Sequence, residues 1–187
     1  MPTPPTLTTE RLILRPWRDD DLAPFAALNA DPEVMEYFPN TLTREESDAM
    51  VERNRVFSAE HGFGWWAVEA PIVAPFIGFI GLWAPSFNAH FLPPGKRVIE
   101  VGWRLARDYW GQGYATEGAR ECLRFGFEVM NLEEIVSFTP AIHKRSQAVM
   151  QRLGMTRDPA DDFNHPGIPP GHRLSRFVLF RKRRPQA

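Results

Sequence analysis

Two closely spaced glycines stand just before a long helix, and this segment carries the residue types that could do chemistry. Gly111 and Gly113 separate an apolar strand at 98–105 from an amphipathic helix at 116–130. A glycine-containing turn at a helix start leaves backbone N–H groups free, and the helix dipole adds about half a positive charge there. The pattern predicts a binding site for an anion, above all a phosphate.

Two familiar phosphate-binding motifs do not match this turn. The nucleoside triphosphate loop needs Gly-Lys-Ser/Thr, which the segment lacks. The dinucleotide fingerprint needs a third small residue where Thr116 stands. The sequence therefore disfavours an ATPase and a nicotinamide-dependent oxidoreductase.

Cysteine and histidine indicate no second kind of chemistry. Cys122, the single cysteine, lies on the apolar stripe of the helix at 116–130, where a buried thiol is usually a small core residue. His90, His165 and His172 lack the spacing of a metal-ligand set. We expect neither covalent catalysis through the cysteine nor a metal site.

The elements around the glycine segment mix strands and helices. Thr43 and Glu46 match a capping box, so a helix should run from there to about residue 60. Residues 65–69 and 76–82 are predicted to form two antiparallel strands joined by a short loop. The order of elements predicts a single domain of the α+β class, with a mixed, mostly antiparallel sheet flanked by helices. Further strands are expected at 11–15, 98–105, 135–139 and 176–180, and further helices after 19–21 and at 116–130 and 145–153.

Composition bounds the class of protein. The 187 residues suit one globular domain, and 22 basic against 23 acidic residues leave a net charge of −1. No global positive field would draw the chain to nucleic acid or to an anionic membrane. The first residues lack a secretory signal, no apolar run reaches the roughly 18 residues needed to span a bilayer, and one cysteine fits a reducing compartment. We expect a cytoplasmic protein with no nucleic-acid or membrane partner.

The glycine segment also resembles the coenzyme A loop of the GNAT family of N-acetyltransferases, whose pattern is Gln/Arg-x-x-Gly-x-Gly/Ala. Gly113 and Ala115 match this pattern, and Trp110 stands at the Gln/Arg position. A tryptophan there, followed by Gly-x-Gly-Tyr-Ala-Thr-Glu, is similar to the branch that includes the ribosomal-protein N-terminal acetyltransferases. The segments 9–15 and 146–155 resemble the same branch.

The resemblance covers about residues 8–181, nearly the whole chain. Three separate segments in the correct order are far more specific than one glycine loop. The resemblance implies one GNAT domain over 8–181, with residues 1–7 and 182–187 as flexible termini.

A site for acetyl-CoA follows from this resemblance. Backbone N–H groups of the loop would hold the pyrophosphate, and the strand before the loop would splay from the next strand to pair with the pantetheine arm. The Leu105 amide would polarise the thioester carbonyl as an oxyanion donor. His143, which stands where the family has asparagine, and Ser146 would contact the same arm. The residues assigned to acetyl-CoA in this way are Trp103, Arg104, Leu105, Trp110, Gly111, Gln112, Gly113, Tyr114, Ala115, Thr116, His143 and Ser146.

The implied reaction is direct attack of an amine on the thioester. The amine must first lose a proton, because its ammonium form dominates at neutral pH. Glu100 matches the position of a glutamate that takes this proton in many relatives. Met150 occupies the position of a tyrosine that protonates the departing thiolate in many relatives, so Ser146 or solvent would serve instead.

The sequence leaves the acceptor open. The branch implies either a protein N-terminus or a small-molecule amine, and the near-neutral charge favours neither. We expect Phe87, His90 and Phe91 to line the acceptor pocket. Because His143 replaces the usual asparagine and Met150 the usual tyrosine, a second interpretation also stays open. In it, the chain is a catalytically silent module that binds or senses an acyl-CoA. Monomer and homodimer are equally open.

Overall fold

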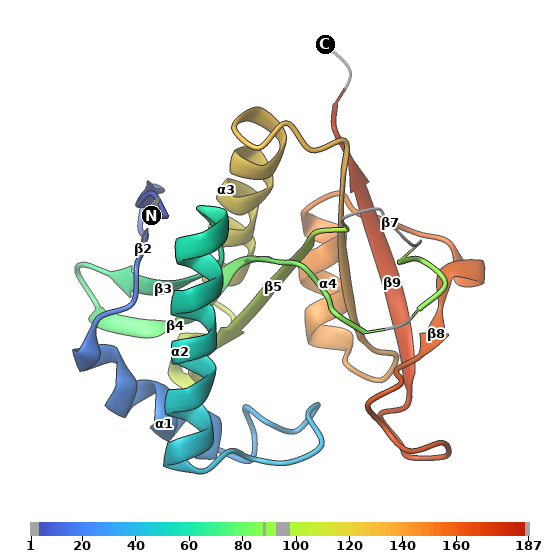
Figure 1. Cartoon of the computed structure of the whole chain (residues 1–187), viewed down its shortest axis with the longest axis horizontal. Coiled ribbons are helices and arrows are strands. Elements are labelled where there is room, and N and C mark those ends of the chain that lie inside the picture. Colours follow the sequence, from blue (N-terminus) through green and yellow to red (C-terminus); the bar gives the residue numbers. More distant parts are fainter. Residues whose placement is uncertain (1–3, 88, 93–97, 186–187) are drawn as a thin grey trace.

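The structure, a computed structural model, describes residues 4–87, 89–92 and 98–185. Its helices are α1 (Leu22–Ala30), α2 (Arg44–His61), α3 (Tyr114–Glu128) and α4 (Lys144–Arg152). Its strands are β1 (Leu7–Thr8), β2 (Ile13–Arg15), β3 (Trp65–Ala70), β4 (Ala74–Trp83), β5 (Glu100–Leu105), β6 (Glu134–Pro140), β7 (Thr156–Arg157), β8 (Phe163–Asn164) and β9 (Arg176–Arg183). Figure 1 shows one sheet with α1 and α2 on one face and α3 and α4 on the other. No helix in the described part of the chain is long and apolar enough to cross a membrane.

The strands pair in the order β1-β2-β3-β4-β5-β6-β9-β7, with β8 against β9. Every neighbouring pair is antiparallel except β5 and β6, which run parallel. The predicted α+β fold with a mixed, mostly antiparallel sheet is therefore confirmed.

The parallel pair at the centre of the sheet, β5 and β6, is joined by very little backbone pairing. β5 and β6 share a single bridge, Glu100 opposite Val136, where the Val136 N–H donates to the Ile99 carbonyl (2.9 Å). Beyond this bridge the two strands separate toward the C-terminal end of β5 (Figure 1). The sheet is therefore open between its β1–β5 half and its β6–β9 half.

Local signals explain the helix boundaries. Thr43 Oγ1 accepts the Glu46 N–H (3.2 Å) and Glu46 Oε2 accepts the Thr43 N–H (2.8 Å), so the predicted capping box is present. Gly62 ends α2 in the left-handed conformation, with φ +75°. α3 begins at Tyr114 rather than at the predicted 116, because Gly113 with φ +86° is its N-cap.

The sheet extends past the ends that the sequence pattern indicated. Leu7 lies in β1 and is buried, and β9 continues to Arg183 instead of ending at 180. Both residues fall in segments that the family resemblance assigned to flexible termini. The domain limits at 8 and 181 stay a prediction.

Hydrophobic side chains pack on both faces of the sheet. The larger cluster lies under α3, where Ala119 and Cys122 are fully buried. A second cluster joins α1 and α2 to the opposite face around Phe25 and Phe79. A third cluster, which includes Phe163, covers the β6–β9 half. This packing holds α3 against the sheet directly after the C-terminal end of β5.

Candidate active site

The glycine loop leads into a helix start whose N–H groups are free. Gly111 and Gly113 both have a left-handed backbone, with φ +74° and +86°. The first helical bond of α3 runs from the Glu117 N–H to the Gly113 carbonyl (3.0 Å), so the N–H groups of residues 114–116 have no acceptor inside the helix. A Cβ placed on Gly111 would meet nothing within 4 Å. The loop therefore has the geometry of an open anion site.

Residues of the N-terminal segment hold the start of α3 in place through hydrogen bonds. Glu117 accepts hydrogen bonds from Thr9 Oγ1 (2.6 Å), the Arg11 N–H (2.8 Å) and Arg11 Nε (2.7 Å). Arg11 Nη1 also donates to the Gln112 carbonyl (3.0 Å), and its guanidinium lies 4.6 Å from the centre of the Tyr114 ring. Although partial burial acts in the opposite direction, these hydrogen bonds lower the pKa of Glu117. Nothing in the local sequence indicates the contact, since its partners are 106 and 108 residues apart.

β5 directs part of its backbone into the opening beside β6. The Ala106 N–H donates to the Ile77 carbonyl (2.9 Å), and hydrogen-bonded residues alternate along an antiparallel pair. The N–H groups of Trp103 and Leu105 therefore point away from β4, toward the side from which β6 has separated. Arg104, which the resemblance placed with them, has its backbone directed at β4 instead.

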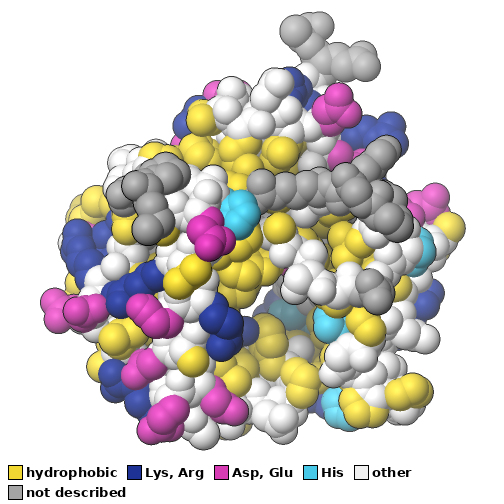
Figure 2. Space-filling model, in the orientation of Figure 1, with side chains coloured by type: hydrophobic (Ala, Val, Ile, Leu, Met, Phe, Trp, Pro, Cys, Tyr) yellow, Lys and Arg dark blue, Asp and Glu magenta, His cyan; other side chains and the backbone are white. Residues whose placement is uncertain are grey.

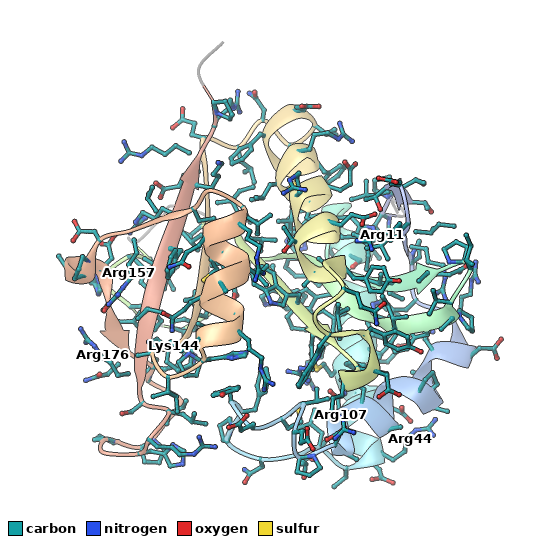
Figure 3. The ribbon with its side chains drawn as sticks, turned by 180° about the vertical axis from the view of Figure 1, so that it is seen from behind. Arg11, Arg44, Arg107, Lys144, Arg157 and Arg176 are labelled. Carbon is teal, nitrogen blue, oxygen red and sulfur yellow. The ribbon has the colours of Figure 1, made fainter. Side chains whose placement is uncertain are left out.

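Trp110 and the start of α4 form the other side of this opening. Trp110 Nε1 donates to the Leu105 carbonyl (2.8 Å), and the Arg145 guanidinium lies 4.3 Å from the centre of the Trp110 ring. His143, the N-cap of α4, stacks on Tyr37 with 3.8 Å between ring centroids. Seen from behind in Figure 3, α3 and α4 begin at the same end of the molecule, near the labelled Arg107 and Lys144. The glycine loop and the start of α4 thus lie together.

Two polar side chains at the start of α4, the half-buried His143 and the buried Ser146, are neutral. His143 Nδ1 is buried and has no hydrogen-bond partner within the described residues. Burial, and then the charge of Arg145, lower the pKa of His143 to about 4, so its imidazole is neutral at pH 7. Ser146 is buried on the first turn of α4. A neutral imidazole and a hydroxyl suit a ligand arm that carries amide groups.

Glu100 lies on the face of β5 that is turned away from α3. Its register partner on β4 is Trp83, and its side chain shares this face with Gly102 and Arg104 because side chains alternate along a strand. Burial raises the pKa of Glu100 to about 8. A carboxylate with such a pKa can take a proton from an ammonium group near physiological pH.

The aromatic residues after β4 lie on the other half of the sheet. Phe87 packs 5.6 Å from Phe138 of β6, and Phe91 is buried in the same cluster. His90 Nε2 lies 4.0 Å from Asp161 Oδ1. The assignment of these loop residues to an acceptor pocket stays a prediction.

Cys122 is fully buried in the core cluster under α3, and burial raises the pKa of its thiol. A thiol in this position is a packing group and not a nucleophile. Within the described residues, no three His, Cys, Asp or Glu side chains gather closely enough to hold a metal ion.

The chain is similar to known acetyltransferases in sequence. A family model described as an acetyltransferase (GNAT) domain matches residues 11–156. The chain is also 35% identical to the FsC-acetyl coenzyme A-N(2)-transacetylase of Aspergillus fumigatus, over 81% of this chain and 65% of that protein.

Solved structures share the fold. A crystal structure of a GNAT-family acetyltransferase from Bacillus anthracis matches with a TM-score of 0.77 at 24% identity, over 96% of this chain and 98% of that one. The crystal structure of a ribosomal-protein alanine acetyltransferase from Vibrio fischeri matches with a TM-score of 0.72 at 16% identity, over 96% of each chain.

Proposed function

Because the chain belongs to the GNAT family of acetyl-CoA-dependent acyltransferases, we propose that it transfers an acetyl group from acetyl-CoA to a primary amine by direct attack. The observation that carries this proposal is the row of free N–H groups at the start of α3, directly beside the open edge of β5. Such a helix start suits a pyrophosphate, and the open strand edge suits the pantetheine arm. His143 Nδ1, which finds no hydrogen-bond partner in the part of the chain that the structure describes, supports a contact with the same arm.

The residues around the opening have separate tasks in this reaction. Acetyl-CoA, when bound, supplies the thioester. The Leu105 N–H, which points into the opening, donates to the thioester oxygen and stabilises the negative charge that develops there. Glu100 accepts a proton from the acceptor's ammonium group, directly or through one water, and the free amine then attacks the thioester; a pKa of about 8 suits this transfer. Ser146 or solvent returns a proton to the thiolate.

The acceptor in this proposal is a small-molecule amine or a protein N-terminus. One relative is named for transacetylation at an N(2) atom, and one structural neighbour for acetylation of a ribosomal protein. The first name supports transfer to a nitrogen atom, and the second supports a protein acceptor. We also place the activity in the cytoplasm, which the single, buried cysteine supports.

Calorimetric titration with acetyl-CoA, followed by an assay of CoA release in the presence of primary amines, tests the proposal. We expect micromolar binding of acetyl-CoA, no binding of NADH or ATP, and CoA release that depends on the added amine. Gly111→Asp brings a carboxylate to the phosphate site and should abolish acetyl-CoA binding. Gly171→Asp is the matched control, because Gly171 also has a positive φ (+81°) and free space around its Cβ position.

Two results would contradict the proposal. Acetyl-CoA binding without any amine-dependent release would indicate the catalytically silent module instead. If the Gly111→Asp and Gly171→Asp variants bind acetyl-CoA with equal affinity, the start of α3 does not bind the pyrophosphate.

A further inference from the structure

We propose that the acceptor amine carries a carboxylate, which Arg104 binds while Glu100 receives the amino group. This inference rests on the proposed acetyl transfer and goes one step further, because it names the chemical class of the acceptor. Its basis is a half-buried guanidinium with a buried Nε, which has no counter-charge among the described residues and lies on the same face of β5 as the candidate base.

The Arg104 guanidinium is enclosed but only partly bonded. Its Nη1 donates to Asn29 Oδ1 of α1 (2.6 Å), and the guanidinium carbon lies 4.0 Å from the centre of the Phe38 ring and 5.5 Å from that of Phe79. Its Nε is buried and has no hydrogen-bond partner within the described residues. Burial lowers the pKa of Arg104 to about 10, which still leaves the side chain charged at neutral pH.

Arg15 is a buried arginine with a structural role, and its guanidinium is fully paired with carboxylates. Arg15 Nη1 and Nη2 donate to the two carboxylate oxygens of Asp21 (2.7 and 2.9 Å), and its Nε donates to Glu69 (2.9 Å). Arg104 forms no ion pair with any residue of the ranges 4–87, 89–92 and 98–185. A buried charge without a partner is unfavourable for folding, so its retention points to a counter-ion that arrives with the substrate.

The space between the base and the cation is open. Gly102 lies between Glu100 and Arg104 on the same face of β5, and a Cβ built on it would meet only Glu100 Oε1, at 3.9 Å. At about 3.3 Å per residue the Cα atoms of Glu100 and Arg104 are about 13 Å apart, and both side chains project from the strand. Figure 2 shows a hollow near the middle of this face, beside β5 and toward the start of α4.

Aromatic rings border this space on β3 and β4. Trp83 is the register partner of Glu100, and Phe79 is the register partner of Arg104. Trp65 stacks between them, with ring centroids 4.5 Å from Trp83 and 4.9 Å from Phe79. Such walls weaken solvent screening, so that the two charges discriminate strongly among ligands. Glu100 and Arg104 together fit a substrate with an ammonium group and a carboxylate.

Steady-state CoA release with matched acceptors tests the inference. The probes are a panel of amino acids and ω-amino acids, each compared with its own carboxamide, which keeps the size but removes the negative charge. We expect kcat/KM to favour the best free acid over its carboxamide by about 100-fold or more. Arg104→Gln should remove this preference by raising the KM of the acid, with the Kd of acetyl-CoA unchanged. Arg55→Gln, on α2, is the control and should retain the preference.

Two further variants separate binding from folding. Gly102→Val fills the open space and should raise the acceptor KM without changing the Kd of acetyl-CoA. Arg104→Met removes an uncompensated charge but also the hydrogen bond to the buried Asn29, so the two effects oppose each other and its Tm should stay within about 2–4 °C of the wild type. A large drop in Tm would instead make Arg104 a structural residue and overturn the inference.

The kinetic outcomes distinguish this inference from the proposed function. If carboxamides and free acids react equally well in the wild type, the carboxylate inference is wrong and the acetyltransferase proposal stands. If no amine of either class releases CoA, both are wrong. An acid preference that persists in Arg104→Gln would move the carboxylate site to another residue and also overturn the inference.

Discussion

Glu100 has an unusual proton affinity because of where its carboxyl lies. The residue begins β5 opposite Trp83, at the one bridge that joins the two halves of the sheet, and burial raises its pKa to about 8. No cation contributes to this shift, since burial is its only cause. The same property predicts effects on both rate and stability.

The first prediction concerns the rate. We expect kcat of the wild type to rise with pH and to level off above about 8, because only the ionised carboxylate accepts the proton of the amine. Glu100→Gln should lower kcat by about 100-fold and remove this rise. Acetyl-CoA affinity should not change, because the side chain lies on the face of β5 turned away from α3. Steady-state rates across the neutral and alkaline range check this, and an unaltered pH profile would place the base elsewhere.

The second prediction concerns stability. The unfolded chain ionises this carboxyl near the ordinary pKa of 4.5 and the folded protein near 8, so between these values the folded state holds a proton that the unfolded state lacks. The Glu100 contribution to stability therefore falls as the pH rises through this window. At pH 8, Glu100→Gln should melt about 10 °C above the wild type, a difference that disappears below about pH 4.5. Calorimetric melting at several pH values checks this, and a gap that does not vary with pH contradicts it.

At the scale of the elements, the start of α3 depends on a distant part of the chain. Thr9 and Arg11 reach Glu117 on its first turn and hold the helix start that presents the free N–H groups. Arg11 also neutralises the Glu117 carboxylate, which would otherwise repel a bound phosphate at this helix end.

The third prediction follows from this contact. Arg11→Ala should raise the Kd of acetyl-CoA about tenfold, or about 1.4 kcal/mol, because it leaves an unpaired carboxylate beside the anion site. Adding Glu117→Gln should restore most of the affinity. Arg124→Ala is the control, since it removes ion pairs to Glu121 and Glu128 farther along the same helix. Calorimetric titration measures all of these affinities, and equal Kd values for Arg11→Ala and Arg124→Ala would contradict the prediction.

Elements with local signals were predictable, and contacts between distant elements were not. The capping box of Thr43 and the apolar stripe of α3 lie within a few residues, so the pattern alone predicted both helices. The glycine loop was found from its local pattern, whereas Glu100 was assigned only through the family resemblance. The sequence did not indicate the contacts of Arg104. Asn29 and Phe38 reach its side chain only after α1 and the segment that follows α1 fold onto the sheet.

At the scale of the whole molecule, the two halves of the sheet meet at one parallel bridge and then separate. A ligand that fills the gap beside β5 would contact both halves at once, through the start of α3 on one side and the start of α4 on the other (Figure 3). Its binding free energy would therefore stabilise the molecule as a unit.

The fourth prediction measures this stabilisation. Acetyl-CoA at about 100 times its Kd should add about 2.7 kcal/mol and raise the Tm by about 5–10 °C. NADH and ATP should leave the Tm unchanged. The Gly171→Asp variant should retain the shift and Gly111→Asp should lose it. A thermal shift that all three nucleotides produce equally would contradict a specific site.

The burial of Cys122 has a practical consequence for such experiments. Its side chain is fully enclosed under α3, and the chain has no other cysteine. A thiol-reactive dye added during turnover would therefore label only released CoA. The dye signal would then measure the amount of CoA released, with no background from the folded enzyme. In denaturant the same cysteine becomes a single reporter, because its labelling rate follows the opening of the core beneath α3.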